Sequence, residues 1–264
     1  MRRRRLGSRV PSQRVIAAVL CGGEGSRLRP LTFYFQKAMI PVGSSQRPLL
    51  EYVVRLLKMH GICDILFLVN YKYEQILNYF GDGSRFGLRI DYLVDRGDRR
   101  GTGWAVLNAY ERGLFEGRVD VLVYYGDILS NIDLTGMLKA HRDSKAYATV
   151  AVSKGYRLPV GVAYVDGFRV IGFEEKPLID IPVCIGIVVF KAEALNMLYG
   201  DFVESRELDT MSHLIPRLIG LGKPVNAYMT GCFWYDLGST EKYEKLDHSL
   251  VDRLFGLKIY ERLQ

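Results

Sequence analysis

Short apolar runs and amphipathic stretches alternate along the first half of the chain. The runs have the length of strands and predict strands at residues 15–20, 65–69, 88–94 and 119–125. Between these runs, apolar side chains recur at helical spacing and predict helices at residues 48–59, 73–80 and 102–113. Strands that alternate with helices are typical of βαβ units. We therefore expect an α/β fold, with a mixed, mostly parallel central sheet and helices on both faces.

The second half of the chain has a different pattern. Polar turns separate short strands that are expected to make small antiparallel additions to the sheet, at residues 146–152, 161–165 and 170–173. A further buried strand is expected at residues 184–190, and strands at residues 224–229 and 233–236 would close the sheet. Helices are expected at residues 192–199, 210–221 and 240–264. No linker or internal repeat divides the chain, so residues 14–264 are expected to form a single domain.

Charge is concentrated at the start of the chain. The net charge is +7, but six arginines and no acidic residue fall within the first 14 residues. Removing these six from the 36 Lys and Arg leaves 30 basic side chains against 29 acidic ones. We expect residues 1–13 to be a flexible basic arm and expect no nucleic-acid partner, although such an arm can hold phosphate backbones weakly. No apolar run approaches the roughly 18 residues of a membrane-spanning helix, so no membrane partner is expected.

The four cysteines argue against a zinc site. They are far apart in the sequence, and the chain has no C-x-x-C pair. Three of them lie in or beside apolar segments, where a free cysteine usually behaves as a small hydrophobic residue. We therefore expect a protein of the reducing cytoplasm.

A glycine-rich loop follows the first strand and carries the first sign of chemistry. It reads GGEGSRLRPLT at residues 22–32. Glycines at the carboxyl end of a parallel strand let backbone amides approach a phosphate chain. The spacing matches neither the dinucleotide-binding fingerprint nor a P-loop. Arg27, Arg29 and Lys37 lie close by with only Glu24 to offset them, and this excess of positive charge suits a polyphosphate.

The glycine-rich loop is the first of a series of motifs. KAMIPV follows at residues 37–42, FGDGS at 80–84, Gly-Thr at 101–102, Gly-Asp at 126–127, FEEKP at 173–177, Gly-Ile at 186–187 and WYDLG at 234–238. In this order they resemble the signature of the sugar-1-phosphate nucleotidylyltransferases, over residues 14–248.

The resemblance implies a GT-A-like Rossmann variant that condenses a nucleoside triphosphate (NTP) with a sugar 1-phosphate and releases pyrophosphate. Residues 80–92 and 126–134 are most similar to the mannose-1-phosphate guanylyltransferases, which implies GTP and mannose 1-phosphate. Related strings in other branches keep dTTP or UTP with glucose 1-phosphate open. We expect no C-terminal β-helix, because the chain ends soon after the last motif.

The reaction that the resemblance implies needs positioning and charge stabilisation. Its nucleophile is a phosphate oxygen that is already ionised, so no side chain has to act as a base. The resemblance implies that Arg27 binds the β- and γ-phosphates, that Lys37 adds a second positive charge, and that Asp127 is the third catalytic residue. The nucleotide-binding residues that it implies are Leu20, Gly22, Gly23, Gly25, Gly101 and Thr102.

Asp127 and Asp236 each end a predicted strand, which places a carboxylate at the rim of the sheet. Two such carboxylates suit Mg²⁺, with phosphate oxygens completing its coordination. An aspartate at the end of a strand often only caps the following turn, and this alternative stays open for both. For the sugar 1-phosphate, the resemblance assigns Lys176 to the phosphate and Glu175 to the hydroxyls, with Gly161 and Cys184 lining the pocket.

Several positions depart from the usual family pattern, namely Cys21, Gln36, Tyr125, the Gly103-Trp104 pair and Cys184. The residues expected to bind phosphate are intact, so these departures concern the identity of the sugar and the base. They also keep open a non-catalytic subunit that binds sugar nucleotides. A related glycosyltransferase would need a D-x-D motif, which is absent from the chain. A homo-oligomer also stays open, because apolar residues near the terminus could form a subunit contact, among them Leu250, Leu254, Phe255, Leu257 and Ile259.

Overall fold

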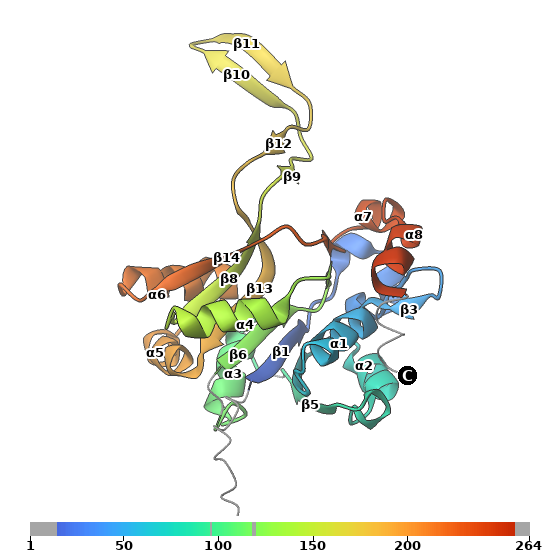
Figure 1. Ribbon diagram of the computed structural model, residues 1–264, viewed down its shortest axis with the longest axis vertical. Coiled ribbons are helices and arrows are strands. Elements are labelled where there is room, and N and C mark those ends of the chain that lie inside the picture. Colours follow the sequence, from blue (N-terminus) through green and yellow to red (C-terminus); the bar gives the residue numbers. More distant parts are fainter. Residues whose placement is uncertain (1–14, 96, 118–119, 257–264) are drawn as a thin grey trace, which may run out of the picture.

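A seven-stranded sheet lies at the centre of the protein (Figure 1). The computed structural model describes residues 15–95, 97–117 and 120–256. Along the sheet, the strand order is β14 (Val225–Thr230), β8 (Ala148–Ser153), β13 (Val183–Lys191), β6 (Asp120–Tyr125), β1 (Val15–Cys21), β4 (Asp64–Val69) and β5 (Arg89–Val94). Neighbouring strands are parallel except where β13 pairs with β6 and with β8. The mixed, mostly parallel sheet that the sequence predicted is confirmed.

Helices cover both faces of this sheet because β1 alternates its side chains between two cores. Ala17 and Val19 pack into the core formed with α1 (Leu49–Met59), α2 (Tyr73–Phe80) and α4 (Leu134–Asp143). Ile16 and Ala18 pack into the other core, formed with α3 (Thr102–Glu111), α5 (Ala192–Phe202) and α6 (Ile215–Gly220). With both faces buried, a parallel strand has to be apolar throughout, as β1 is.

Short helical turns connect the larger elements. The loop after β1 holds the 3₁₀ turns η1 (Ser26–Leu28), η2 (Leu31–Phe33) and η3 (Lys37–Met39), and η4 (Ser84–Phe86) follows α2. The helix expected at residues 210–221 is divided into a π-helical turn, η5 (Thr210–Leu214), and α6. Asp209 begins η5 by accepting hydrogen bonds from the backbone N–H groups of Met211 and Ser212. Of the helical segment expected at residues 240–264, the described part forms α7 (Thr240–Glu244), α8 (His248–Val251) and the π-helical turn η6 (Asp252–Gly256), and residues 257–264 lie outside the described residues.

An arm projects from the sheet between β8 and β13 (Figure 1). It consists of two small antiparallel pairs, β9 (Tyr156–Arg157) with β12 (Leu178–Ile179), and β10 (Val162–Asp166) with β11 (Arg169–Glu174). The prediction that residues 161–165 and 170–173 extend the central sheet is therefore wrong. These strands pair only with each other, so only β8 of this region joins the sheet.

A second correction concerns the end of the sheet. β14 forms an edge strand, as expected for residues 224–229, but β15 (Trp234–Asp236) does not close the sheet. It pairs instead with β7 (Ile128–Ser130), and a further small pair joins β2 (Pro41–Val42) to β3 (Arg47–Pro48). Sequence analysis also missed α4, although Leu134, Met137, Leu138 and His141 have helical spacing and Asp133 caps the helix.

Two sequence-based expectations fall outside the described residues. These are the basic arm at residues 1–13 and the apolar side chains of Leu257 and Ile259. Among the residues that are described, no helix has both the length and the apolar character needed to cross a bilayer.

Candidate active site

Two cavities meet at the carboxyl end of β6. The larger has a volume of about 680 Å³ and lies beside the ends of β1, β4 and β6. The smaller has a volume of about 410 Å³ and lies between β6, β13 and β15. Tyr125 and Asp127 line both cavities. A molecule in one cavity can therefore meet a molecule in the other at these two residues.

The larger cavity brings together most of the residues predicted to bind the nucleotide. Its lining includes Leu20, Gly22, Gly23, Lys37, Gly101, Thr102 and Asp127. Gly25 is not part of this lining. Its φ is +64°, and a Cβ there would lie 2.9 Å from the Thr32 side chain, whose hydroxyl donates to the Gly25 carbonyl over 2.9 Å. Gly25 therefore shapes the loop from behind the cavity.

Gly101 and Thr102 form another part of the wall of the larger cavity, and contacts with residues 206–210 fix their position. Gly101 has a φ of +98°, and a Cβ there would lie 2.0 Å from the carbonyl oxygen of Leu208, so a larger side chain does not fit. The Thr102 hydroxyl donates to Asp209 over 2.6 Å. Burial acts to raise the pKa of Asp209, but the hydrogen bonds from Thr102, Ser212 and Met211 outweigh it and lower that pKa. Asp209 thus stays ionised and keeps the Thr102 hydroxyl oriented.

Lys37 and Asp127 form an ion pair at the rim where the cavities meet. Lys37 begins η3, and the preceding residue, Gln36, holds that turn in place. The Gln36 side chain accepts from the N–H of Ala38 over 2.6 Å and donates to the carbonyl of Cys21 over 2.6 Å. Gln36 is almost completely buried. In the sequence, Gln36 stood out only as a departure from the family pattern. Its hydrogen bonds indicate that it positions the turn that carries Lys37.

Asp127 and Asp236 lie together because β7 and β15 pair. Ile128 stands opposite Asp236 in this pair, and the N–H of Leu237 donates to the carbonyl of Asp127 over 3.0 Å. Both carboxylates line the smaller cavity, and Arg27 lines it with them. Asp236 also accepts from Lys242 over 2.6 Å. No described residue forms an ion pair with Arg27, which leaves its guanidinium available to an anion.

The carboxylates of Asp127 and Asp236 suit a hard cation that takes its remaining oxygen ligands from phosphates and water. Among the described residues, no group of three or more His, Cys, Asp and Glu side chains gathers at one point. Asp127 and Asp236 therefore offer two carboxylates, which is the number that Mg²⁺ uses beside phosphates and water. In the structure these carboxylates have Lys37 and Lys242 as partners.

The predicted sugar-binding residues are not all brought together. Cys184 lines the smaller cavity and its sulfur lies 3.7 Å from that of Met211. Gly161, Glu175 and Lys176 belong to the arm and line neither of the two cavities. The base of the arm does reach the site, because Tyr156 stacks on Trp234 with ring centroids 5.9 Å apart. Tyr156, Trp234 and Lys242 were missed as site residues, although Trp234 belongs to the WYDLG motif.

The cysteines only partly follow the expectation of buried, apolar surroundings. Cys21 is buried, and burial raises the pKa of its thiol well above the ordinary value. Cys63 and Cys184 are exposed, and Cys232 is intermediate. All four cysteines are free thiols.

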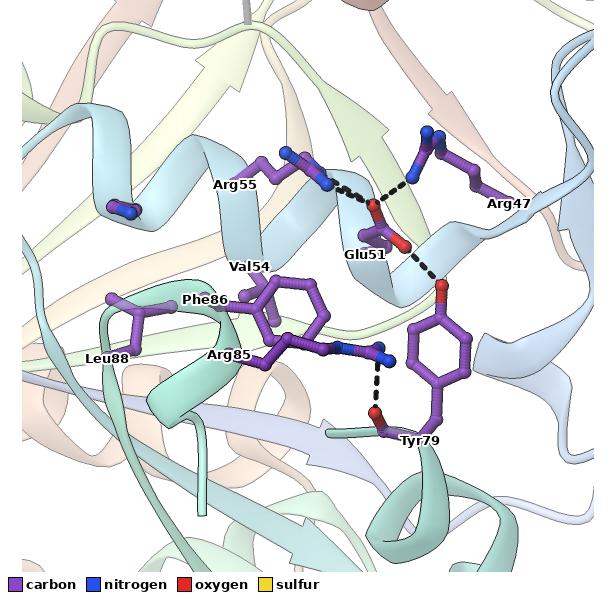
Figure 2. A pocket seen from close by; sticks show the side chains of 9 residues that line it. Arg47, Glu51, Val54, Arg55, Tyr79, Arg85, Phe86 and Leu88 are labelled. Carbon is purple, nitrogen blue, oxygen red and sulfur yellow. Dashed lines mark hydrogen bonds and ion pairs between the residues drawn. The ribbon is translucent and has the colours of Figure 1, made fainter. Parts of the chain in front are cut away.

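A third cavity, of about 390 Å³, shares no lining residue with the other two (Figure 2). The carboxylate of Glu51 stands at its centre. It accepts from Arg47 over 2.8 Å, from Arg55 over 2.7 Å, and from the hydroxyl of Tyr79. Burial and the hydrogen bond to Glu51 raise the pKa of Tyr79 to about 12. These contacts tie α1 to α2, and we assign the cluster to stability.

Comparisons with known proteins identify a family for this chain. Residues 16–253 match the nucleotidyl transferase family. UTP–glucose-1-phosphate uridylyltransferase of Synechocystis is 31% identical, over 90% of this chain and 63% of the relative. Mannose-1-phosphate guanylyltransferase of Mycobacterium tuberculosis is 30% identical, over 91% of this chain and 66% of the relative. The chain thus spans about two thirds of the length of these relatives.

The fold is also shared with solved structures. HddC from Yersinia pseudotuberculosis, solved with GMP-PN, superposes with a TM-score of 0.67 at 18% identity, over 87% of this chain and 96% of that one. This likeness supports the fold class. The chain belongs to the nucleotidyl transferase family, and the resemblance to sugar-1-phosphate nucleotidylyltransferases drawn from its motifs is confirmed.

Proposed function

We propose that this chain transfers a nucleoside monophosphate from an NTP to a sugar 1-phosphate, with release of pyrophosphate. The single observation that carries the proposal is that two cavities meet at Asp127. The larger is lined in part by the glycine-rich loop, and its volume suits a nucleotide. The smaller, beside it, would take the sugar 1-phosphate.

The cationic side chains at the junction supply the electrostatics of the reaction. Two phosphate groups repel each other, so their approach needs positive charge at the point of contact. Lys37 at the rim and Arg27 in the smaller cavity provide it. Asp127 and Asp236 would hold Mg²⁺, which would stabilise the charge that develops on the phosphates.

The identities of the base and sugar belong to this proposal as a finer step. GTP with mannose 1-phosphate is our first choice, from the motifs at residues 80–92 and 126–134. UTP or dTTP with glucose 1-phosphate are the alternatives. Of the two relatives described above, one is named a uridylyltransferase and the other a guanylyltransferase. We further propose a reducing cytoplasmic setting, in keeping with the four free cysteines.

Pyrophosphate release tests the reaction. The purified chain is incubated with Mg²⁺ and each pairing of GTP, UTP or dTTP with mannose 1-phosphate or glucose 1-phosphate. We expect release only when both substrates are present, and for one pairing far more than for the others. The Lys37→Ala variant, prepared in parallel, controls for contaminating enzymes and should lose about 10²-fold or more in rate. Binding of a sugar nucleotide without any release across the panel would instead identify a non-catalytic binding subunit.

A further inference from the structure

The third cavity, of about 390 Å³, carries an excess of positive charge in its walls. Glu51 is the one acidic side chain among the described residues that line it. The basic side chains that line it with Glu51 are Arg47, Arg55, Lys58 and Arg85. The Glu51 carboxylate already accepts from Arg47 and Arg55, and from the hydroxyl of Tyr79 (Figure 2). Glu51 therefore offsets only part of the positive charge.

Lys58 and Arg85 carry the rest of this charge. Among the described residues, no carboxylate forms an ion pair with either of them. A Cβ at Gly87 would lie 3.0 Å from the Nζ of Lys58, so the ammonium group lies against the end of η4. Arg85 lies over the rings of Tyr79 and Phe86, 4.9 and 4.8 Å from their centroids, and donates to the Tyr79 carbonyl over 2.9 Å. A guanidinium has five N–H donors, so Arg85 keeps donors for a ligand.

The chemistry of this cavity suits a phosphate ester. Guanidinium groups bind phosphate oxygens in pairs, and an ammonium group adds a point charge. Only 16% of the Arg55 side chain is exposed, so solvent screens the charge less here than on an open surface. The lining also has an apolar part, made by Val54, Phe86 and Leu88. The volume lies within the range of roughly 300–1,000 Å³ that is usual for small organic ligands.

We propose that this cavity is an effector site for a small phosphorylated metabolite, a phosphate monoester on an organic body the size of a sugar. Lys58 and Arg85 bind the phosphate group, and the apolar side chains contact the organic body. Arg47 and Arg55 stay paired with Glu51 and add to the positive potential. The contribution of Glu51 to stability is part of this arrangement, because it joins the walls of the site before the ligand arrives.

The wall formed by α2 is bonded to the turn that carries Lys37. Gln75 lies one helical turn before Tyr79 on α2. Its side chain accepts from the backbone N–H of Gln36 over 2.7 Å. Gln36 directly precedes Lys37 and caps the turn η3. A shift of α2 would therefore be felt at the lysine on the rim of the active site.

The wall formed by β3 and α1 is bonded to the same turn. Arg47 belongs to β3, which pairs with β2, and β2 follows η3 in the chain. The N–H of Leu49, at the start of α1, donates to the carbonyl of Ile40 over 3.0 Å. A ligand that bridges the two walls favours the arrangement in which Lys37 stands at the rim. We therefore expect it to tighten NTP binding, and this coupling rests on the proposed function.

Isothermal titration calorimetry on the full chain tests the site, with glucose 6-phosphate as the ligand and glucose as the uncharged control. Glucose 6-phosphate should bind with an affinity that falls as salt is added, and glucose should not bind. The double variant Lys58→Gln/Arg85→Gln should weaken binding by about tenfold or more. Arg112→Gln/Lys223→Gln removes the same charge near α3 and α6, on the other face of the sheet, and should bind like the wild type. Circular dichroism and the Tm establish that each variant is folded.

Hydrogen–deuterium exchange then locates the ligand. Glucose 6-phosphate should protect residues 47–58 and 79–88. Protection confined to residues 22–37 would overturn the proposal, because the ligand would then occupy the active site. A wild-type chain that does not bind would overturn it too, and so would a folded Lys58→Gln/Arg85→Gln variant that binds equally well. These measurements do not depend on the proposed reaction.

Initial rates test the coupling. Saturating glucose 6-phosphate should lower KM for the NTP by about fivefold or more in the wild type and should leave it unchanged in the Lys58→Gln/Arg85→Gln variant. Without the ligand, this variant should match the wild type, since neither residue lines the two cavities of the active site. An unchanged KM in an active enzyme would overturn the effector role. A chain that binds the ligand here but catalyses no transfer would overturn the proposed function and support the site.

Discussion

The side-chain amide of Gln36 donates a hydrogen bond to the backbone carbonyl of Cys21, with 2.6 Å between nitrogen and oxygen. It thereby ties the turn that carries Lys37 to the end of β1. The same side chain caps that turn through Ala38, and the backbone N–H of Gln36 donates to Gln75 over 2.7 Å. One buried amide thus holds a charged residue of the site against the central strand.

Replacing Gln36 by Ala should destabilise the protein by about 1–3 kcal/mol, because buried hydrogen-bonding groups lose their partner. Chemical denaturation measures this as a lower midpoint. Asn78→Ala removes an exposed amide from α2 and should change the free energy of unfolding by less than about 0.5 kcal/mol. Gln36→Ala should also raise KM for the NTP, since Lys37 is no longer held at the rim. Equal stability of the two variants would contradict the positioning role of Gln36.

Asp127→Asn and Asp236→Asn should each reduce Mg²⁺-dependent turnover by roughly two orders of magnitude or more, because each removes an anionic oxygen ligand. The double variant should be little worse than either single one, as expected for two residues that hold the same ion. Steady-state pyrophosphate release measures this. Asp180→Asn, at an exposed carboxylate near the base of the arm, is the control and should remain active. Additive losses would show that the two carboxylates act separately.

Lys176→Ala should raise KM for the sugar 1-phosphate much more than KM for the NTP, since we propose that this lysine meets only the sugar's phosphate. Initial rates with each substrate varied in turn separate the two constants. Lys154→Ala removes another exposed lysine beside the arm and serves as the control. Lys176 lines neither site cavity in the structure. An unchanged KM for the sugar 1-phosphate would therefore place it outside the site.

Glu51→Gln should destabilise the protein by about 2–3 kcal/mol, because Arg47 and Arg55 lose a buried, charged partner. Burial alone would raise the pKa of Glu51, but Tyr79 and the two arginines outweigh it and lower that pKa. The contribution of Glu51 to stability is therefore complete above the ordinary pKa of 4.5 and is lost as the pH falls through the lowered value. Denaturation at neutral and acidic pH should show the variant and the wild type converging in acid. Glu74→Gln, at an exposed glutamate of α2, should follow the wild type at every pH.

The sequence by itself determined the elements whose signals are local. The apolar run of β1 and the helical spacing of α1 and α2 predicted these elements within one or two residues, because each must bury a continuous face or stripe. The glycines after β1 and the positive charge around them, Lys37 included, indicated a polyphosphate, and the family resemblance then assigned them to phosphate binding. The same reasoning placed Asp127 at the rim of the sheet, where the structure has it.

Only the tertiary structure decided which of these elements meet. Asp127 and Asp236 are more than 100 residues apart and share a cavity because β7 pairs with β15, and no local pattern records such a pairing. The alternation in β10 and β11 correctly predicted two strands but could not tell whether they pair with the sheet or only with each other. A period of two specifies which face of a strand is apolar. Contacts with distant parts of the chain, or with a second chain, decide what covers that face.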